Sequence, residues 1–241
     1  MAQDQEARTR TRVKGDVPVT MSEIPAQVWQ LDAASVSDAN KTVRVLPREL
    51  RPYSQGVRMV GRAVTVAASA DLVPVLAGLQ MCETGDILVV DAGTTEHAVL
   101  GELFATEAVR RGMAGIVVYG LCRDTVTLAQ LPIPIYALGT IPRAVGAKEI
   151  PFTQRTIRLG KVEVNPGEIL IGDDDGIVVL SDKELDAALE AAEAIQRQEA
   201  AIRAAIQGGA SLFDHLNYSE HVENLHAGRS TSLAFRTEDD R

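Results

Sequence analysis

An arginine and an aspartate stand side by side directly after an apolar run, in the segment GIVVYGLCRD (115–124). The run is typical of a buried strand, and ligands of open α/β sheets gather at the carboxyl ends of the strands. There, the guanidinium fork of Arg123 suits a carboxylate, and the oxygens of Asp124 suit a hard metal ion. The structural alternative is that Asp124 caps a helix and Arg123 lies in solvent, because aspartate is among the commonest N-caps.

A second segment, VVDAGTTEHAVLGELFATEA (89–108), runs from an apolar stretch through a loop into a helical pattern that begins near Gly101. Such a loop presents backbone N–H groups and the positive end of a helix dipole, which together suit an anion. Gly101 allows the backbone to approach a ligand closely, and Glu102 is placed to support a water bound to a metal. The alternative is an ordinary helix start, where glycine and an acidic residue are common.

A third candidate, Glu199, interrupts the apolar face of a long helix. Ser181 and Glu184 form the pattern of a capping box at its start, and Gly208-Gly209 marks its end. The apolar stripe consists of Leu185, Leu189, Ala192, Ile195, Ile202 and Ile206. The same steps of three and four residues reach Glu199, and an unpaired carboxylate among apolar side chains is costly. We therefore expect a polar partner, either in a binding site or in a structural ion pair within the subunit.

The elements that must position these residues alternate between strand-like and helix-like patterns, which predicts an α/β fold. Strands are expected at Arg62 to Ala67, Ile87 to Asp91, Gly115 to Tyr119 and Ile135 to Leu138. A helix over GELFATEAVRRG (101–112) connects the second and third of these strands. The segment VEVNPGEILIGDDDGIVVL (162–180) indicates short strands that form a small β lid or closing layer. Residues 19 to 45 show helix-like spacing, and Trp29 is assigned to core or interface packing.

Composition limits the class of protein. The 241 residues, 46% hydrophobic and 24% charged, fit a packed domain with extensions rather than a disordered chain. A net charge of −9 opposes general nucleic-acid binding, and the basic residues between Arg8 and Lys14 are interpreted as a solvated tail rather than a nucleic-acid arm. Two cysteines cannot form a disulfide framework, and neither a signal peptide nor a membrane span is recognisable. We expect a soluble, cytoplasmic protein with small-molecule or protein partners and no nucleic-acid or membrane partner.

Two other sets of residues are given structural roles. His215, His221 and His226 are spaced by six and five, which does not place them on one helix face, so we do not expect a metal site there. Cys122 is interpreted as a small buried residue at a strand end rather than an activated thiol.

Taken together, the two strand-end segments and four further pieces resemble the RraA-like family, which includes the 4-hydroxy-4-methyl-2-oxoglutarate and 4-carboxy-4-hydroxy-2-oxoadipate aldolases. The resemblance covers about Ser37 to Asp214, and its pieces in order are MVGRAVTV, TGDILVVDAG, LGELFATEAVRRGMAGIVVYGLCRD, PIPIYALGTIPR, VNPGEILIGDDDGIVVL and QEAAIRAAIQGGASLFD. It implies an α-β-β-α sandwich like the swivelling phosphohistidine domain, assembled as trimers or hexamers with a site between subunits. We expect a flexible tail over 1–18, the catalytic domain over 19–208, and a C-terminal helical extension and tail over 209–241.

The resemblance also implies roles for individual residues. Asp124 would bind Mg²⁺ or Mn²⁺, mostly alongside water molecules, and Arg123 would hold a carboxylate or hydroxyl of the substrate. Glu199 would reach the site from a neighbouring subunit. The carboxylate of a pyruvoyl unit would be held by four consecutive backbone N–H groups, those of Gly101, Glu102, Leu103 and Phe104.

These implied roles describe a class II aldolase that cleaves 4-hydroxy-2-oxo acids to pyruvate and a second oxo acid. Cleavage leaves the enolate of pyruvate, whose charge a cation and oriented donors stabilise without a Schiff-base lysine. Oxaloacetate decarboxylation gives the same enolate, and a water near Glu102 would serve as the base. The chain departs from the family pattern in the loop DAGTTEH, in Leu100 where some relatives carry tryptophan, and in Glu102, which is one methylene longer than the common aspartate.

Two other functions remain as alternatives. The family's namesake inhibits a ribonuclease by binding it, so the chain is compared with a protein-binding regulator that has no catalytic activity. The namesake type lacks the arginine-aspartate pair, so Arg123 and Asp124 favour an enzyme, although a fold alone does not decide function. The loop departures keep a third reading open, a family member that acts on another 2-oxo or sugar acid.

Overall fold

The computed structural model describes residues 8–9, 20–21, 23–69, 71–93, 96–148 and 153–236. The chain consists of two compact units, Met1–Ala192 and Glu193–Arg241. The tail expected over 1–18 lies outside the described residues except for Arg8–Thr9, which forms a two-residue strand (β1) paired with Thr20–Met21 (β2).

The first unit is built on a mixed sheet with the strand order β3-β13-β12-β5-β6-β8-β9-β4, in which β7 pairs with β8. Its parallel centre contains all four expected strands, each slightly longer than predicted: β5 (Met59–Ala67), β6 (Asp86–Asp91), β8 (Gly115–Cys122) and β9 (Ile135–Thr140). Most of their side chains are buried on both faces of the sheet. Burial on both faces explains why these strands appear in the sequence as continuous apolar runs.

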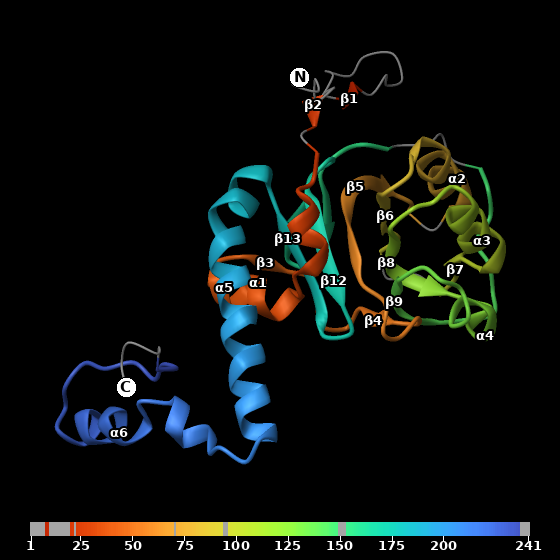
Figure 1. Cartoon of the computed structure of the whole chain (residues 1–241). Coiled ribbons are helices and arrows are strands. Elements are labelled where there is room, and N and C mark those ends of the chain that lie inside the picture. Colours follow the sequence, from red (N-terminus) through yellow and green to blue (C-terminus); the bar gives the residue numbers. More distant parts are fainter. Residues whose placement is uncertain are drawn as a thin grey trace. The chain divides into compact units, whose positions relative to one another are not determined.

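Successive side chains of each central strand enter different cores. Leu88 and Val90 of β6 pack beneath the helices α2 (Leu72–Met81) and α3 (Glu102–Arg110). Ile87 and Val89 point to the opposite face, which is covered in part by the hairpin of β10 (Ile157–Leu159) and β11 (Val162–Val164). Figure 1 shows α2 and α3 beside β6 and β8. The result is the mixed α/β fold that the sequence predicted, with a curled mixed sheet and helices at the C-terminal end of the chain.

The interpretation of residues 162–180 as a lid or closing layer is wrong for its larger part. The hairpin of β12 (Ile169–Asp173) and β13 (Gly176–Leu180) joins the main sheet, because β12 pairs antiparallel with β5 and β13 pairs with β3 (Arg44–Val45). Both faces of the hairpin are buried, since Leu170 and Val179 enter one core and Ile171 and Val178 enter another. Strands with two buried faces belong inside a sheet and cannot form an exposed lid.

In the described part of residues 19 to 45, the helix-like spacing corresponds to two short helices, η1 (Ala26–Gln30) and α1 (Ala33–Ala39). The remainder includes the strands β2 and β3. Asp32 accepts a hydrogen bond from the Ser35 N–H at 2.7 Å and so caps α1. Trp29 is 45% exposed in the single chain, which contradicts a place in its core and leaves interface packing as a prediction.

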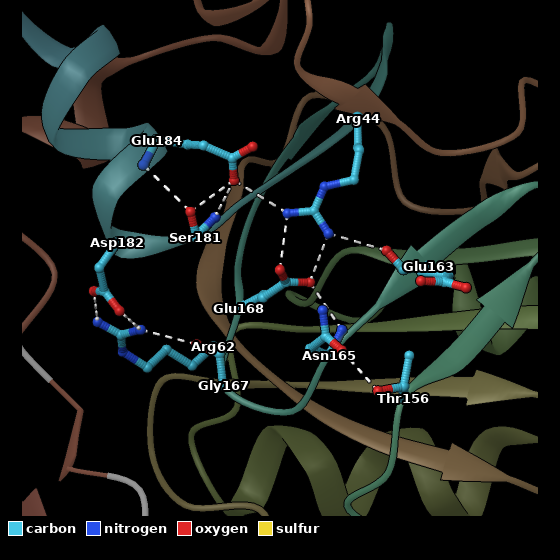
Figure 2. Close-up of polar contacts among 10 residues, drawn as sticks. All are labelled: Arg44, Arg62, Thr156, Glu163, Asn165, Gly167, Glu168, Ser181, Asp182 and Glu184. Carbon is cyan, nitrogen blue, oxygen red and sulfur yellow. Dashed lines mark hydrogen bonds and ion pairs between the residues drawn. The ribbon is translucent and has the colours of Figure 1, made fainter.

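The start of the long helix α5 (Asp182–Gln207) is tied to the sheet by charged and capping contacts (Figure 2). The expected capping box is present, because the Ser181 N–H donates to Glu184 Oε2 at 2.7 Å and the Glu184 N–H donates to Ser181 Oγ at 3.3 Å. Arg44 of β3 donates to both carboxylate oxygens of Glu168, at 2.8 and 2.9 Å, and reaches Glu184 at 3.2 Å. The nearly buried Arg62 of β5 pairs with Asp182 at 2.7 Å.

The second unit contains the end of α5, the 3-10 helix η2 (Leu212–His215) and α6 (Tyr218–His226). Its last described segment is held by Asn217, whose side chain accepts from the Ala234 N–H at 2.8 Å and donates to the Ser232 carbonyl at 3.0 Å. Within the part of the chain that the structure describes, no helix combines the length and apolar character needed to cross a bilayer.

Candidate functional site

Strand pairing brings the two candidate segments together. The short strand β7 (Ala98–Leu100) runs parallel to the end of β8, and the Arg123 N–H donates to the Leu100 carbonyl at 3.0 Å. Each of the two strands is followed by a helix: α3 begins after Gly101, and α4 (Thr125–Leu128) begins after Asp124. Two helix N-termini therefore lie at the carboxyl ends of neighbouring strands. The sequence predicted the strand-end position of both segments and the helix that begins near Gly101.

Asp124 does not cap its own helix. It stands at the N-cap position of α4 without a side-chain cap hydrogen bond, in the left-handed conformation with φ 63° and ψ 37°. Its carboxylate instead accepts from the N–H of Glu102 at 3.1 Å, across the strand pair. The structural alternative is thus correct about the N-cap position of Asp124 and wrong about a capping bond, because the carboxylate is directed to the neighbouring helix start.

Gly101 makes this arrangement possible through its lack of a side chain. A Cβ atom there would lie 2.6 Å from Asp124 Oδ2 and 3.2 Å from Arg123 Nε. The backbone of Gly101 is extended, with φ −147° and ψ −175°, so any residue could adopt the conformation. Space, not backbone freedom, therefore demands glycine at this position.

The guanidinium of Arg123 lies beside Asp124, with Nε 3.6 Å from Oδ2. The two side chains are 44% and 35% exposed, so the pair is open to a ligand. They line a pocket of about 90 Å³ together with the start of α3 and an apolar wall that consists of Leu72, Ala98, Val99, Leu100, Phe104 and Ala144. The side chain of Leu103 also lines this pocket, and it is 75% exposed. The arrangement offers a charged end for an anion or cation and an apolar wall beside it.

Thr127 is a site residue that sequence reasoning missed. Its hydroxyl lies 2.8 Å from Glu102 Oε2, and the Thr127 N–H donates to the Asp124 carbonyl at 3.0 Å. The sequence offers one indication of a role for Thr127, since the segment TVTL (125–128) directly follows Arg123 and Asp124. The spacing of residues does not show that a threonine of α4 reaches α3.

Cys122 is buried between the strands, and its Sγ lies 3.6 Å from the Gly139 carbonyl. Burial raises the pKa of the Cys122 thiol to about 11. The thiol stays protonated near neutral pH, which agrees with a packing role and opposes a nucleophilic one.

Glu199 and the histidines lie elsewhere in the chain. Glu199 belongs to the second unit and is exposed in the single chain, and it takes part in none of the ion pairs recorded among the described residues. The ion pair within its own subunit that we considered is therefore not seen in the described part of the chain. No group of three or more histidine, cysteine or acidic residues able to hold a metal occurs within residues 23–69, 71–93, 96–148 and 153–236.

Comparison with known proteins places the chain in a family. The model of the RraA-like family, described as Aldolase/RraA, matches residues 33–179, which include the whole candidate site except Glu199. The chain belongs to the RraA-like family. A provisionally named 4-hydroxy-4-methyl-2-oxoglutarate aldolase of Burkholderia multivorans is 36% identical over 154 residues, covering 61% of this chain and 91% of the relative. A relative of the same provisional name from Halalkalibacterium halodurans is 32% identical over 182 residues, covering 75% and 87%.

A solved RraA-like structure extends the comparison to the fold. RraAS2 of Streptomyces coelicolor, described as an unusual member of the RNase ES inhibitor RraA protein family, superposes with a TM-score of 0.66 at 25% identity. The match covers 76% of this chain and 98% of RraAS2. The RraA-like fold therefore accommodates proteins named for two different functions, and residues must decide between them.

Proposed function

We propose that this RraA-like protein is a divalent-metal-dependent lyase that cleaves 4-hydroxy-2-oxo acids, of the 4-hydroxy-4-methyl-2-oxoglutarate or 4-carboxy-4-hydroxy-2-oxoadipate type, to pyruvate and a second oxo acid. The same site would decarboxylate oxaloacetate. The observation that carries the proposal is the placement of the Asp124 carboxylate and the Arg123 guanidinium, 3.6 Å apart, at the N-terminus of α3. The Asp124 carboxylate, which can bind a cation, and the Arg123 guanidinium, which can bind a carboxylate, then line the same small pocket.

Asp124 suits a hard cation that keeps most of its water. Mg²⁺ is often held by only one or two protein carboxylates, and the absence of a larger ligand cluster in the described residues agrees with such a site. The Glu102 N–H holds the Asp124 carboxylate by a hydrogen bond, and the absence of a side chain at Gly101 leaves room for it. When bound, Mg²⁺ or Mn²⁺ would stabilise the negative charge that develops on the 2-oxo oxygen.

The substrate carboxylate would bind to Arg123 and to backbone donors at the start of α3. The first N–H groups of a helix have no partner within the helix. The Glu102 N–H already donates to Asp124, and the Ala105 N–H donates to the Gly101 carbonyl at 3.2 Å. Of the four donors that the family resemblance implied, we therefore assign the pyruvoyl carboxylate to the N–H groups of Gly101, Leu103 and Phe104, and not to that of Glu102.

Cleavage then needs a base that deprotonates the 4-hydroxyl and a proton donor that protonates C3 of the enolate. A water held by Glu102 takes the proton of the 4-hydroxyl, the bond between C3 and C4 breaks, and its electron pair passes into the enolate of pyruvate as the second oxo acid leaves. The same proton returns to C3 and completes pyruvate. Arg123 and the helix N-terminus hold the carboxylate throughout, so the charge develops beside oriented donors.

The proposal includes a second copy of the chain. We propose that the protein assembles as a trimer or hexamer and that Glu199 completes the site of a neighbouring subunit. Its exposure in the single chain leaves the carboxylate available for such a contact.

The test is pyruvate formation from 4-hydroxy-4-methyl-2-oxoglutarate, 4-carboxy-4-hydroxy-2-oxoadipate and oxaloacetate, with added Mg²⁺ or Mn²⁺ and with a chelator. We expect turnover that the chelator abolishes and that Asp124→Asn reduces by at least about a hundredfold, because a neutral amide is a poor anchor for a hard cation. Circular dichroism checks that the variant is folded. Unchanged activity of Asp124→Asn would remove the metal assignment.

A protein-binding regulator is the second candidate, because RraAS2 shares the fold and its description names a ribonuclease inhibitor. It predicts no turnover of any of the three acids at any metal concentration, together with binding to an RNase E-type ribonuclease. Turnover that depends on Arg123 and Asp124 would argue against it.

A further inference from the structure

The starts of α3 and α4 exchange contacts in both directions. Asp124, just before α4, accepts from the N–H of Glu102, the first residue of α3, at 3.1 Å. Thr127 of α4 donates in return to the Glu102 carboxylate at 2.8 Å. The Thr127 N–H also bonds to the Asp124 carbonyl at 3.0 Å. The three residues form a closed set of hydrogen bonds that fixes both acids of the site relative to each other.

The hydroxyl of Thr127 had a local alternative. A threonine near the start of a helix can donate to the carbonyl three residues earlier, which is that of Asp124 here and already accepts from the Thr127 N–H. The hydroxyl instead spans two helices to reach an ionisable side chain. Hydrogen bonds to a charged acceptor are stronger than hydrogen bonds between neutral groups. The contact therefore favours one conformation of the Glu102 side chain, whose three rotatable bonds would otherwise allow several.

We propose that Thr127 is a positioning residue for the reaction, which holds the Glu102 carboxylate where it serves proton transfer. This inference rests on the proposed lyase function. It also gives a reason for the length of Glu102, since the longer side chain spans the distance to α4 while its backbone N–H remains bonded to Asp124. Thr127 itself does not touch the reacting atoms.

The decisive variant is Thr127→Val, which keeps the branched shape and removes the hydroxyl. We expect kcat for 4-hydroxy-4-methyl-2-oxoglutarate cleavage to fall about tenfold, with KM and the Mn²⁺ concentration for half-maximal activity unchanged. The loss of one charge-assisted hydrogen bond displaces the Glu102 carboxylate, which holds the catalytic water, but not the groups that bind substrate and metal. Thr127→Ser should restore most of the activity. Thr125→Val makes the same chemical change in the same helix and should keep the wild-type kcat.

Because Thr127 acts through Glu102, the two substitutions should not add. We expect Glu102→Ala/Thr127→Val to retain the residual kcat of Glu102→Ala alone, since no side chain then remains for Thr127 to position. Additive losses, an unchanged Thr127→Val enzyme or a rise in the Mn²⁺ requirement would each overturn the inference, the last by showing that Thr127 only supports the Asp124 turn. A wild-type protein without turnover would instead contradict the lyase function and this inference with it.

Discussion

At the scale of single residues, the site depends on the missing side chain of Gly101. A Cβ at this position would come within 2.6 Å of Asp124 Oδ2. Because the clash involves the end of a side chain rather than the backbone, the fold can absorb it by rotation of Asp124. That rotation would break the hydrogen bond to Glu102 and redirect the proposed metal ligand.

We therefore predict that Gly101→Ala remains folded but needs about ten times more Mn²⁺ for half-maximal pyruvate formation, as expected for the loss of about 1.4 kcal/mol of binding energy. Metal titration of activity checks the shift, and thermal unfolding checks the fold. Gly146→Ala is the matched control, because the nearest atom to a Cβ at Gly146 is 4.0 Å away. Equal metal requirements for both variants would contradict the assigned role of Gly101.

At the scale of elements, α5 begins beside two arginines of the sheet, since Arg44 pairs with Glu184 and Arg62 pairs with Asp182. The pKa of Glu184 is lowered by the backbone N–H of Ser181 and, to a lesser extent, by the Ser181 hydroxyl and by Arg44. A carboxyl whose pKa is lowered in the folded state stabilises the fold above its unfolded pKa, and the stabilisation is lost as the pH falls through the folded pKa.

We predict that Glu184→Ala lowers the free energy of unfolding by about 1 kcal/mol at pH 7, the usual effect of losing a helix cap. The difference from the wild type should shrink as the pH falls below about 4.5, the ordinary range of a glutamate carboxyl. Urea unfolding at pH 7 and at pH 3.5 measures both values. Glu190→Ala, an exposed acid farther along α5, serves as the control. A difference as large at pH 3.5 as at pH 7 would show that the carboxylate is not the stabilising group.

At the scale of the whole molecule, we propose that the exposed Glu199 completes the site of a neighbouring subunit. If a neighbouring subunit supplies it, Glu199→Ala and Asp124→Ala should each be inactive as pure oligomers. Mixed oligomers should regain part of the activity, because some subunit pairs then contain both intact residues. Activity of co-purified, differently tagged subunits checks this, with separately purified variants as the baseline. Mixed oligomers without recovery would place Glu199 outside a shared site.

Much of the architecture could be predicted from local pattern. The four central strands, α3 and the capping box of α5 all follow from apolar runs, helical spacing and a four-residue motif, which are properties of short segments. The lid assignment failed because the strands on either side of Asp173 are apolar on both faces, and local pattern cannot show which strand they pair with. The core alternative for Trp29 is wrong for a similar reason, since the residue type does not show whether the fold of the single chain buries it.

The sequence by itself determined which residue types stand at the strand ends, and so placed Gly101, Arg123 and Asp124 at one edge of a parallel sheet. Only the tertiary structure decided how they meet. The pairing of β7 with β8 directs Asp124 to the start of α3 rather than to its own helix, and it brings Thr127 within 2.8 Å of Glu102. These contacts join positions more than twenty residues apart through side-chain directions, which depend on strand register and helix packing and not on spacing along the chain.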